Sequence, residues 1–317
     1  MIDKKFLERI FAQDKRAVSR SISIIEYGNS ESNNLLKEIF TKIGNAYRIG
    51  ITGPPGAGKS TLTNQLTKFY RRQNKTVGII AVDPTSPFTG GALLGDRVRM
   101  SEVGRDEGVF IRSMATRGSL GGLSKKSIDA GDVLDAAGYD IVIYETVGVG
   151  QSELDIAQTA DTTIVVLVPE SGDSIQAMKA GLMEIADLFI LNKSDRAGAE
   201  NALSALQTIL MLKNSHDSDW FPKIVKTIAP ENIGIEEAAE EIENHKEYLL
   251  SSGLFKIKRE ENSKIRIKKI VEMILKKELW NEERENRLEH LVEEVVIGNL
   301  SPYQLADEII TNYKSQI

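Results

Sequence analysis

The chain has 317 residues, of which 41% are apolar and 27% charged, a composition that suits a globular protein of roughly two domains and argues against fibrous or disordered architectures. Its 40 lysines and arginines against 46 aspartates and glutamates give a formal net charge of −6, so we expect no global positive field that would hold nucleic acid or an anionic membrane. The chain contains no cysteine, which excludes disulfides, thiolate metal ligands and thiol nucleophiles and favours a reducing, cytoplasmic setting.

Residues 1–47 are predicted to form a helical N-terminal extension. In residues 1–11 charged side chains interrupt the apolar ones, so this stretch lacks the continuous apolar core of a secretory signal. Apolar residues then recur every three or four positions, which is typical of amphipathic helices. The two apolar clusters are Val18, Ile22 and Ile25, and Leu35, Leu36, Ile39 and Phe40.

From residue 48 to residue 252 short β-branched runs alternate with helical stretches, which is the pattern of βαβ units. Each run is far shorter than the ~20 residues that a helix needs to cross a bilayer. We therefore expect one α/β domain, with a mostly parallel sheet and helices on both of its faces. The predicted strands lie at 49–51, 77–82, 141–143, 164–168, 189–191 and 224–225.

A glycine-rich motif follows the strand expected at 48–52 and precedes a helix expected at 60–72. Its pattern, G-x-x-x-x-G-K-S, is that of a phosphate-binding loop, and a strand before it and a helix after it are the context such a loop requires. The glycines let backbone amides converge on phosphate oxygens, Lys59 adds a point charge, and Ser60 offers a hydroxyl to Mg²⁺. The nucleotide-binding residues predicted here are Gly53, Pro54, Pro55, Gly56, Ala57, Gly58, Lys59, Ser60 and Thr61.

A second motif reads N-K-S-D and follows the strand expected at 189–191, where a base pocket is expected. An aspartate in that pocket accepts from both N1–H and the exocyclic amine of guanine, whereas adenine lacks this pair of donors. The ligands are therefore predicted to be GTP and GDP. A backbone amide beyond the strand at 224–225 lies where it could donate to the guanine carbonyl oxygen. The residues of this predicted pocket are Asn192, Lys193, Asp195 and Ala229.

Acidic residues at the ends of predicted strands are candidate ligands for Mg²⁺. The carboxyl ends of parallel strands meet where such a sheet binds its ligand, and Mg²⁺ prefers oxygen ligands. Glu145 is the best placed, because it ends the strand at 141–143 and opens a segment with glycines at 148 and 150. A single aspartate after a strand is as often a helix cap or a turn residue as a ligand. The predicted metal ligands are Ser60, Asp83, Asp96 and Glu145.

Residues 253–317 are predicted to form a helical C-terminal region with narrow apolar stripes. Gly298 is expected to end one helix. Ser301, Pro302 and Gln304 then have the pattern of an N-cap, a first helical residue and a capping-box partner. The apolar stripes could pack against the main domain or against a second copy of the chain, and the sequence leaves both arrangements open.

Histidine and arginine residues outside these motifs give weaker indications. No histidine has the spacing of a metal site or a catalytic triad, so each is expected to be solvated or partly packed. Arginines in glycine-rich linkers could approach phosphates or the acidic groups of a partner. The basic stretch 256–277 is expected to be a solvated helix face rather than a nucleic-acid surface. These residues are His216, His245 and His290, and Arg97, Arg99, Arg112 and Arg117.

Together the motifs resemble those of the MeaB/ArgK-type P-loop GTPases, the family of the methylmalonic aciduria type A protein. Glu145 matches the glutamate that distinguishes this group in the third GTPase motif. Ile228 departs from the family, which usually has serine there, but the expected guanine contact comes from the backbone. The matching segments are Gly53–Ser60, Ala81–Gly91, Leu94–Arg97, Phe110–Gly118, Leu120–Gly122, Glu145–Glu153, Ser171–Asp173 continuing to Asp187, and Asn192–Asp195.

The resemblance implies a magnesium-dependent GTPase chaperone that is a homodimer and docks on an adenosylcobalamin-dependent acyl-CoA mutase, usually methylmalonyl-CoA mutase. Such a protein gates cofactor loading, protection or reactivation of the mutase. The resemblance also implies that Lys59 and Glu145 act in hydrolysis and that segment 169–181, with Lys179, is a switch that couples the nucleotide to the partner. Gln151 and Glu153 are candidates for positioning the attacking water. No nucleic acid and no membrane is expected among the partners.

Three other readings of the phosphate-binding loop remain open from the sequence. A nickel metallochaperone GTPase would need cysteine or clustered histidine ligands, which the sequence lacks. A small-molecule kinase would need an acceptor pocket and a closing lid, which no motif specifies. A scaffold that binds the nucleotide without useful hydrolysis could be distinguished from a GTPase by measuring whether GTP is consumed.

Overall fold

The computed structural model of the chain describes residues 2–28, 30–83, 102–115, 125–146, 152–171, 180–213 and 220–315. The chain forms two compact units, Met1–Lys256 and Ile257–Ile317. The larger unit contains the sheet and both predicted nucleotide motifs. None of the helices in the described ranges is long and apolar enough to span a membrane.

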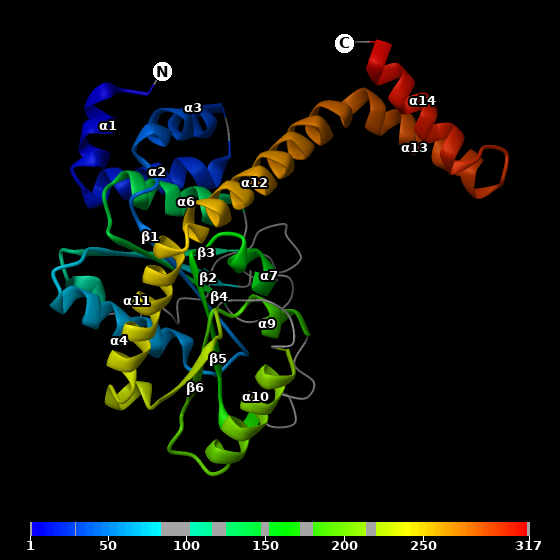
Figure 1. Cartoon of the computed structure of the whole chain (residues 1–317). Helices are drawn as coiled ribbons and strands as arrows, with labels where there is room; N and C mark the ends of the chain where they lie inside the picture. Colours follow the sequence, from blue (N-terminus) through cyan, green and yellow to red (C-terminus); the bar gives the residue numbers. More distant parts are fainter. Residues whose placement is uncertain are drawn as a thin grey trace. The chain divides into compact units, whose positions relative to one another are not determined.

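Within those ranges, seven strands form one parallel sheet in the order β3-β2-β4-β1-β5-β6-β7 (Figure 1). The central strands are runs of buried residues, as expected for strands that are covered on both faces. The predicted α/β class with a parallel sheet is therefore confirmed. The strands are β1 (Tyr47–Thr52), β2 (Val77–Asp83), β3 (Val109–Ala115), β4 (Ile141–Thr146), β5 (Thr162–Leu167), β6 (Leu188–Asn192) and β7 (Lys223–Thr227).

The edge strand β3 is missing from the sequence-based prediction because polar residues interrupt its apolar run. One of them, Arg112, donates from Nη2 to Ser23 Oγ at 3.2 Å and forms an ion pair with Glu26, both on a helix at the N-terminus. The expectation that Arg112 lies in a glycine-rich linker is therefore wrong. It lies on a strand and ties the sheet edge to that helix.

Helices cover both faces of the sheet. On one face α4 and α11 bury residues such as Leu62 and Ile242 against the strands. On the other face α6 and α7 form one apolar cluster with the strands, and α9 and α10 form another. These helices are α4 (Lys59–Arg72), α6 (Lys125–Ala136), α7 (Ser152–Ala157), α9 (Ala180–Ile185), α10 (Ala199–Lys213) and α11 (Ile235–Ser251).

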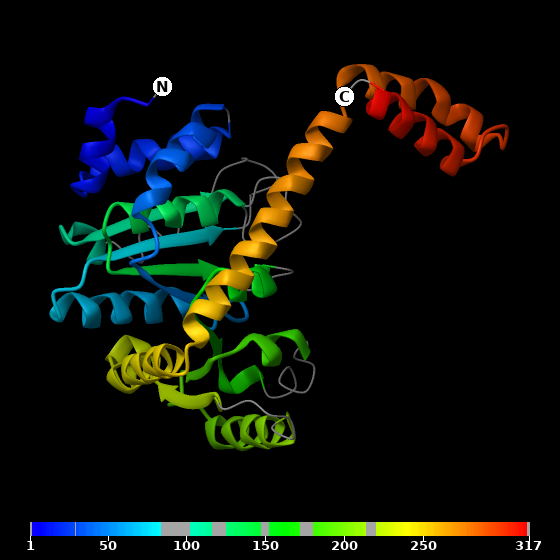
Figure 2. The ribbon, with the colours of Figure 1, turned by 45° about the horizontal axis from the view of Figure 1, so that its top comes forward.

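The N-terminal helices α1 (Lys4–Phe11), α2 (Lys15–Tyr27) and α3 (Ser30–Ile39) pack outside α6, which itself lies on the sheet (Figure 2). The two apolar clusters predicted from the sequence contribute to the core that these helices form with α6. Their buried members are Val18, Ile22, Ile25, Leu35 and Ile39.

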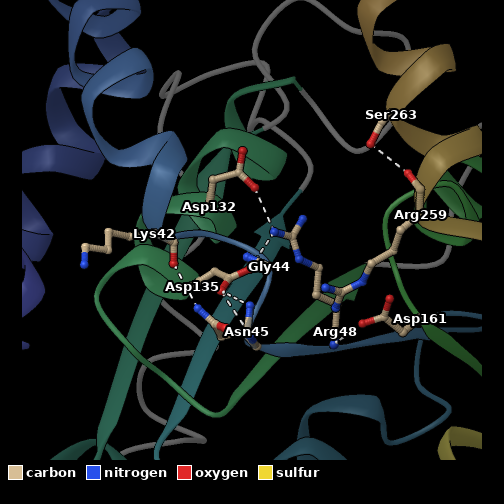
Figure 3. Close-up of polar contacts among 10 residues, drawn as sticks. Lys42, Gly44, Asn45, Arg48, Asp132, Asp135, Asp161, Arg259 and Ser263 are labelled. Carbon is tan, nitrogen blue, oxygen red and sulfur yellow. Dashed lines mark hydrogen bonds and ion pairs between the residues drawn. The ribbon is translucent and has the colours of Figure 1, made fainter. Parts of the chain in front are cut away.

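A buried ionic cluster fixes the chain just before β1. Asp135, on α6, accepts hydrogen bonds from the backbone amides of residues 44–46 at distances of 2.9 to 3.0 Å. Arg48 pairs with both Asp132 and Asp135, each at 2.9 Å (Figure 3). The end of the N-terminal extension is thus joined to α6 and to β1. This strand leads into the phosphate-binding loop.

The smaller unit contains most of α12 (Leu254–Leu279), followed by α13 (Glu282–Val296) and α14 (Pro302–Ser315). The predicted capping box of α14 is confirmed, since the Gln304 amide donates to Ser301 Oγ at 3.1 Å and the Ser301 amide donates to Gln304 Oε1 at 3.0 Å. The end of α12 and the two later helices line an apolar groove of about 330 Å³. Its walls include Trp280, Val292 and Leu305.

Candidate nucleotide site

The phosphate-binding loop connects β1 to α4 at the carboxyl edge of the sheet. Gly53 has a φ of +137°, and a Cβ atom there would lie 2.1 Å from the carbonyl oxygen of Val166 on β5. Gly58 has a φ of +90°, and its Cβ would lie 2.3 Å from Nδ2 of Asn192. At both positions an L side chain would be strained by the positive φ and would clash with the neighbouring atom, so both positions require glycine. The loop therefore packs directly on β5 and on the second motif.

Lys59 holds a positive charge inside this loop. The side chain is 6% exposed, and its ammonium donates to the carbonyl oxygens of Gly53 and Pro54 at 2.8 and 2.9 Å. The loop also ends at the N-terminus of α4, whose free amides and dipole attract anions. Gly56, at the tip, is exposed, and a Cβ atom there would meet no atom of the described residues within 4 Å. These features suit a phosphate group.

Ser60 and Glu145 face each other beside the loop. Ser60 Oγ donates to Glu145 Oε1 at 2.5 Å, and Glu145 is 5% exposed. The contact follows from strand order, because β4 lies next to β1 and Glu145 pairs in register with Ile51. One residue further on, Thr146 Oγ1 donates to Thr52 Oγ1 at 2.9 Å, so side chains as well as backbone join the two strand ends.

These oxygens fit Mg²⁺. A hydroxyl and a carboxylate next to a phosphate-binding loop are hard donors, and Mg²⁺ commonly binds one or two carboxylates together with phosphates and water. Of the other predicted ligands, Asp83 ends β2 and is described by its backbone, whereas Asp96 lies outside the described residues.

Asn192 joins three segments that are far apart in the sequence. It is 1% exposed, and its Nδ2 donates to the Ala57 carbonyl of the phosphate-binding loop at 2.8 Å. Its Oδ1 accepts from Thr227 Oγ1 at 3.0 Å and from the Ala229 amide at 3.2 Å. A single buried side chain therefore connects the loop, the second motif and the turn after β7.

The other residues of the predicted base pocket lie around this network. Lys193 has a φ of +58°, and its Nζ donates to the Gly56 carbonyl at 2.8 Å, so it spans from the second motif to the loop tip. Asp195 is exposed at the same edge. The Ala229 amide is engaged by Asn192, while the Ala229 carbonyl accepts from Gln65 Nε2 on α4 at 3.0 Å. This amide could make the predicted contact with guanine only if its hydrogen were shared between Asn192 Oδ1 and the base.

An ion pair near this pocket has no signal in the sequence motifs. Glu170, in the short helix η3 (Pro169–Ser171) that follows β5, pairs with Arg196, the residue after Asp195. The Arg196 hydrogen bond and the nearby Lys193 charge lower the pKa of Glu170. The two residues of this pair lie far apart in the sequence, as do Gln65 and Ala229, so no local motif indicates either contact.

The remaining predicted site residues differ in how far the structure describes them. Gln151 and Lys179 lie outside the described residues, as does most of the segment proposed as a switch. In the loop Pro55 is exposed and Ala57, whose carbonyl binds Asn192, is buried; Thr61, on α4, is half-buried.

His245 corrects the expectation that every histidine is solvated or partly packed. It is 2% exposed, with Nδ1 2.8 Å from Thr162 Oγ1 and Nε2 3.5 Å from Asp187 Oδ1. The signal in the sequence is its place on the apolar stripe of α11, three residues after Ile242 and four before Leu249.

Comparison with known proteins agrees with these motifs. A family profile described as "Methylmalonyl Co-A mutase-associated GTPase MeaB" matches residues 18–284. A Pyrococcus abyssi protein with a provisional GTPase designation is 47% identical over 312 residues, which cover 98% of this chain and 96% of that protein. The mouse protein named methylmalonic aciduria type A homolog, mitochondrial, is 34% identical over 286 residues, or 85% of this chain and 66% of that protein.

Among solved structures, one named LAO/AO transport system kinase superposes with a TM-score of 0.75. It is 28% identical in sequence, and the match covers 99% of both chains. The similarity therefore extends over the helical regions at both ends as well as over the sheet.

Proposed function

The chain belongs to the MeaB family of methylmalonyl-CoA mutase-associated GTPases, and from that premise we propose that it binds GTP with Mg²⁺ and hydrolyses it to GDP and phosphate. The contacts of Asn192 support this proposal most directly. They bring the phosphate-binding loop, the second motif and the turn after β7 together, as a nucleotide with a phosphate end and a base end would require.

The two ends of the nucleotide would be recognised by different chemistry. Lys59 and the amides at the start of α4 would neutralise phosphate oxygens. The Asp195 carboxylate would accept from N1–H and the exocyclic amine of guanine, and an adenine base would leave this carboxylate unpaired. The pocket would therefore favour guanine over adenine nucleotides.

Hydrolysis would depend on positioning and electrostatic stabilisation. Ser60 and Glu145, together with Asp83 and Asp96, would hold Mg²⁺, which when bound adds positive charge at the phosphates. Gln151 is the proposed group for orienting the attacking water. GTPases without a supplied arginine turn over slowly, so we expect an intrinsic rate on the order of 10⁻⁴ to 10⁻² per second.

The proposed client is an adenosylcobalamin-dependent acyl-CoA mutase, with methylmalonyl-CoA mutase favoured by the family description. The protein would gate cofactor loading, protection or reactivation. This coupling requires the mutase to bind the GTP and GDP states with different affinity. Segment 169–181, with Lys179, is the proposed sensor of the nucleotide state. The chain would act as a homodimer, for which the apolar groove of the smaller unit offers a surface.

A base-switch experiment tests the nucleotide part of this proposal. Asp195→Asn replaces an acceptor with an amide whose N–H₂ can donate to the C2 carbonyl of xanthine. We expect the wild-type protein to prefer GTP to ATP and the variant to shift its preference to xanthosine triphosphate, both measured by calorimetric titration. Lys59→Ala should abolish tight binding of every triphosphate. An unchanged preference for GTP in Asp195→Asn would remove this residue from the base pocket.

A further inference from the structure

The sheet order places the end of β5 between the two halves of the nucleotide pocket. The phosphate-binding loop follows β1 and the second motif follows β6, and β5 is the strand that separates them. Val165 pairs in register with Thr52, and Leu167 pairs with Leu191. A nucleotide with its phosphates at β1 and its base at β6 must therefore cross the end of β5 with its sugar.

The chain that leaves β5 places an acidic side chain at this crossing. Glu170 is three residues beyond Leu167, and it pairs with Arg196, the residue after Asp195, so it lies beside the second motif. Lys193 spans the same region, because its ammonium donates to the Gly56 carbonyl at the loop tip. The carboxylate of Glu170 is thus beside the path from the loop to the base pocket.

The present partner of Glu170 can be exchanged. The side chains of Glu170 and Arg196 are 52% and 48% exposed, and ion pairs of such exposure contribute little net stability. A carboxylate has two oxygens that accept in several directions, which suits two neighbouring hydroxyls. An acidic side chain that accepts from a ribose hydroxyl is also the solution found in dinucleotide-binding α/β folds.

We propose that the Glu170 carboxylate accepts hydrogen bonds from the ribose hydroxyls of the bound guanine nucleotide in place of Arg196, and so distinguishes ribonucleotides from deoxyribonucleotides. This role rests on the proposed guanine-nucleotide site and adds to it a determinant of sugar specificity. Arg196 then orients the carboxylate when no nucleotide is bound.

The test compares GDP with 2′-deoxy-GDP and 3′-deoxy-GDP, since diphosphates avoid hydrolysis during the titration. Affinities are measured by calorimetry on unlabelled nucleotides, because fluorescent groups attached to the ribose would block the hydroxyls.

For the wild-type chain we expect one of the deoxynucleotides to bind about tenfold more weakly than GDP, as expected for the loss of a hydrogen bond to a charged acceptor. In Glu170→Ala this ratio should fall to near one, with GDP weakened and the deoxynucleotide nearly unchanged. Glu170→Gln should give an intermediate ratio.

Arg196→Ala is the matched control, because it breaks the same ion pair and leaves the carboxylate in place. It should keep the preference for the ribonucleotide. A wild-type ratio near one, equal weakening of all three nucleotides in Glu170→Ala, or loss of the ratio in both variants would overturn the ribose role. If the wild-type chain binds no GDP at all, the proposed function fails and the ribose role fails with it, so the two failures can be told apart.

Discussion

Asn192 joins the phosphate-binding loop, the second motif and the turn after β7 through one buried side chain. Among single residues, we therefore expect the protein's stability to be sensitive to substitution at this position. Its two polar atoms satisfy the Ala57 carbonyl, the Thr227 hydroxyl and the Ala229 amide. Removing the side chain would leave these buried groups without that partner, and a buried unsatisfied group costs about 1–3 kcal/mol.

For Asn192→Ala we therefore predict a fall of about 2–3 kcal/mol in the free energy of unfolding and at least about tenfold weaker GDP binding. Urea unfolding and calorimetric titration measure the two effects. Asn201→Ala, on an exposed position of α10, is the matched control and should change the free energy of unfolding by less than about 0.5 kcal/mol. A fully stable Asn192→Ala variant with unchanged GDP affinity would mean that these contacts do not hold the site together.

The sequence motifs predict a phosphate-binding loop and a base pocket, but few of the contacts between their residues. Local patterns of glycine, lysine and serine are sufficient to recognise a phosphate-binding loop. The contact of Gln65 with Ala229 and the ion pair of Glu170 with Arg196 depend on which strands become neighbours. Strand order is set by the whole chain, so no local pattern reports these contacts.

At the scale of elements, the attachment of the N-terminal helices depends on α6 as much as on apolar packing. Asp135 on α6 is 1% exposed and accepts four hydrogen bonds, three of them from the backbone amides of residues 44–46 and one from Arg48. We expect these contacts to fix both the end of the helical extension and the start of β1.

Asp135→Asn should lower the free energy of unfolding by about 2–3 kcal/mol, because it removes a buried negative charge from Arg48 and turns one acceptor into a donor that faces backbone amides. Hydrogen exchange should show the largest loss of protection at residues 44–48. Asp132→Asn is the comparison variant: it weakens the ion pair with Arg48 but keeps the acceptor of the three backbone amides, so it should leave residues 44–46 protected. Equal effects of the two substitutions would contradict the role given to the amides.

The elements that the sequence predicted best are those with a strong apolar period. The central strands and the N-terminal apolar clusters were found because burial on both faces, or on one helical stripe, leaves a clear pattern. The edge strand β3 was missed because Arg112 uses its polar side chain to hold α2 rather than to face solvent. The polar partners of His245, Thr162 on β5 and Asp187 just before β6, lie far from it in the sequence, so no local motif indicates them.

At the scale of the whole molecule, buried tyrosines limit stability at high pH. Burial is the main cause that raises the pKa of Tyr139 to about 12 and the pKa values of Tyr47 and Tyr70 above their usual range. The folded state thus holds these phenols neutral after they would ionise in the unfolded chain. Their contribution to stability is complete below about pH 10 and is lost as the pH rises toward their folded-state pKa values.

We predict that phenolate absorbance from these residues appears together with loss of circular dichroism, above about pH 10. Tyr70→Phe should move this alkaline unfolding to higher pH without loss of stability at pH 7, because the buried Tyr70 hydroxyl has no hydrogen-bond partner in the part of the chain that the structure describes. Tyr47→Phe is the contrasting variant. It removes a 2.5 Å hydrogen bond to Thr162 and should cost about 1 kcal/mol at pH 7.

We propose that this chain uses GTP in the service of an adenosylcobalamin-dependent mutase. The most direct test measures GTP turnover by the purified protein with and without methylmalonyl-CoA mutase from the same organism. We predict slow turnover alone, on the order of 10⁻⁴ to 10⁻² per second, and a marked rise when the mutase is added. Turnover at tens per second without a partner, or the same slow rate with and without the mutase, would contradict the claim.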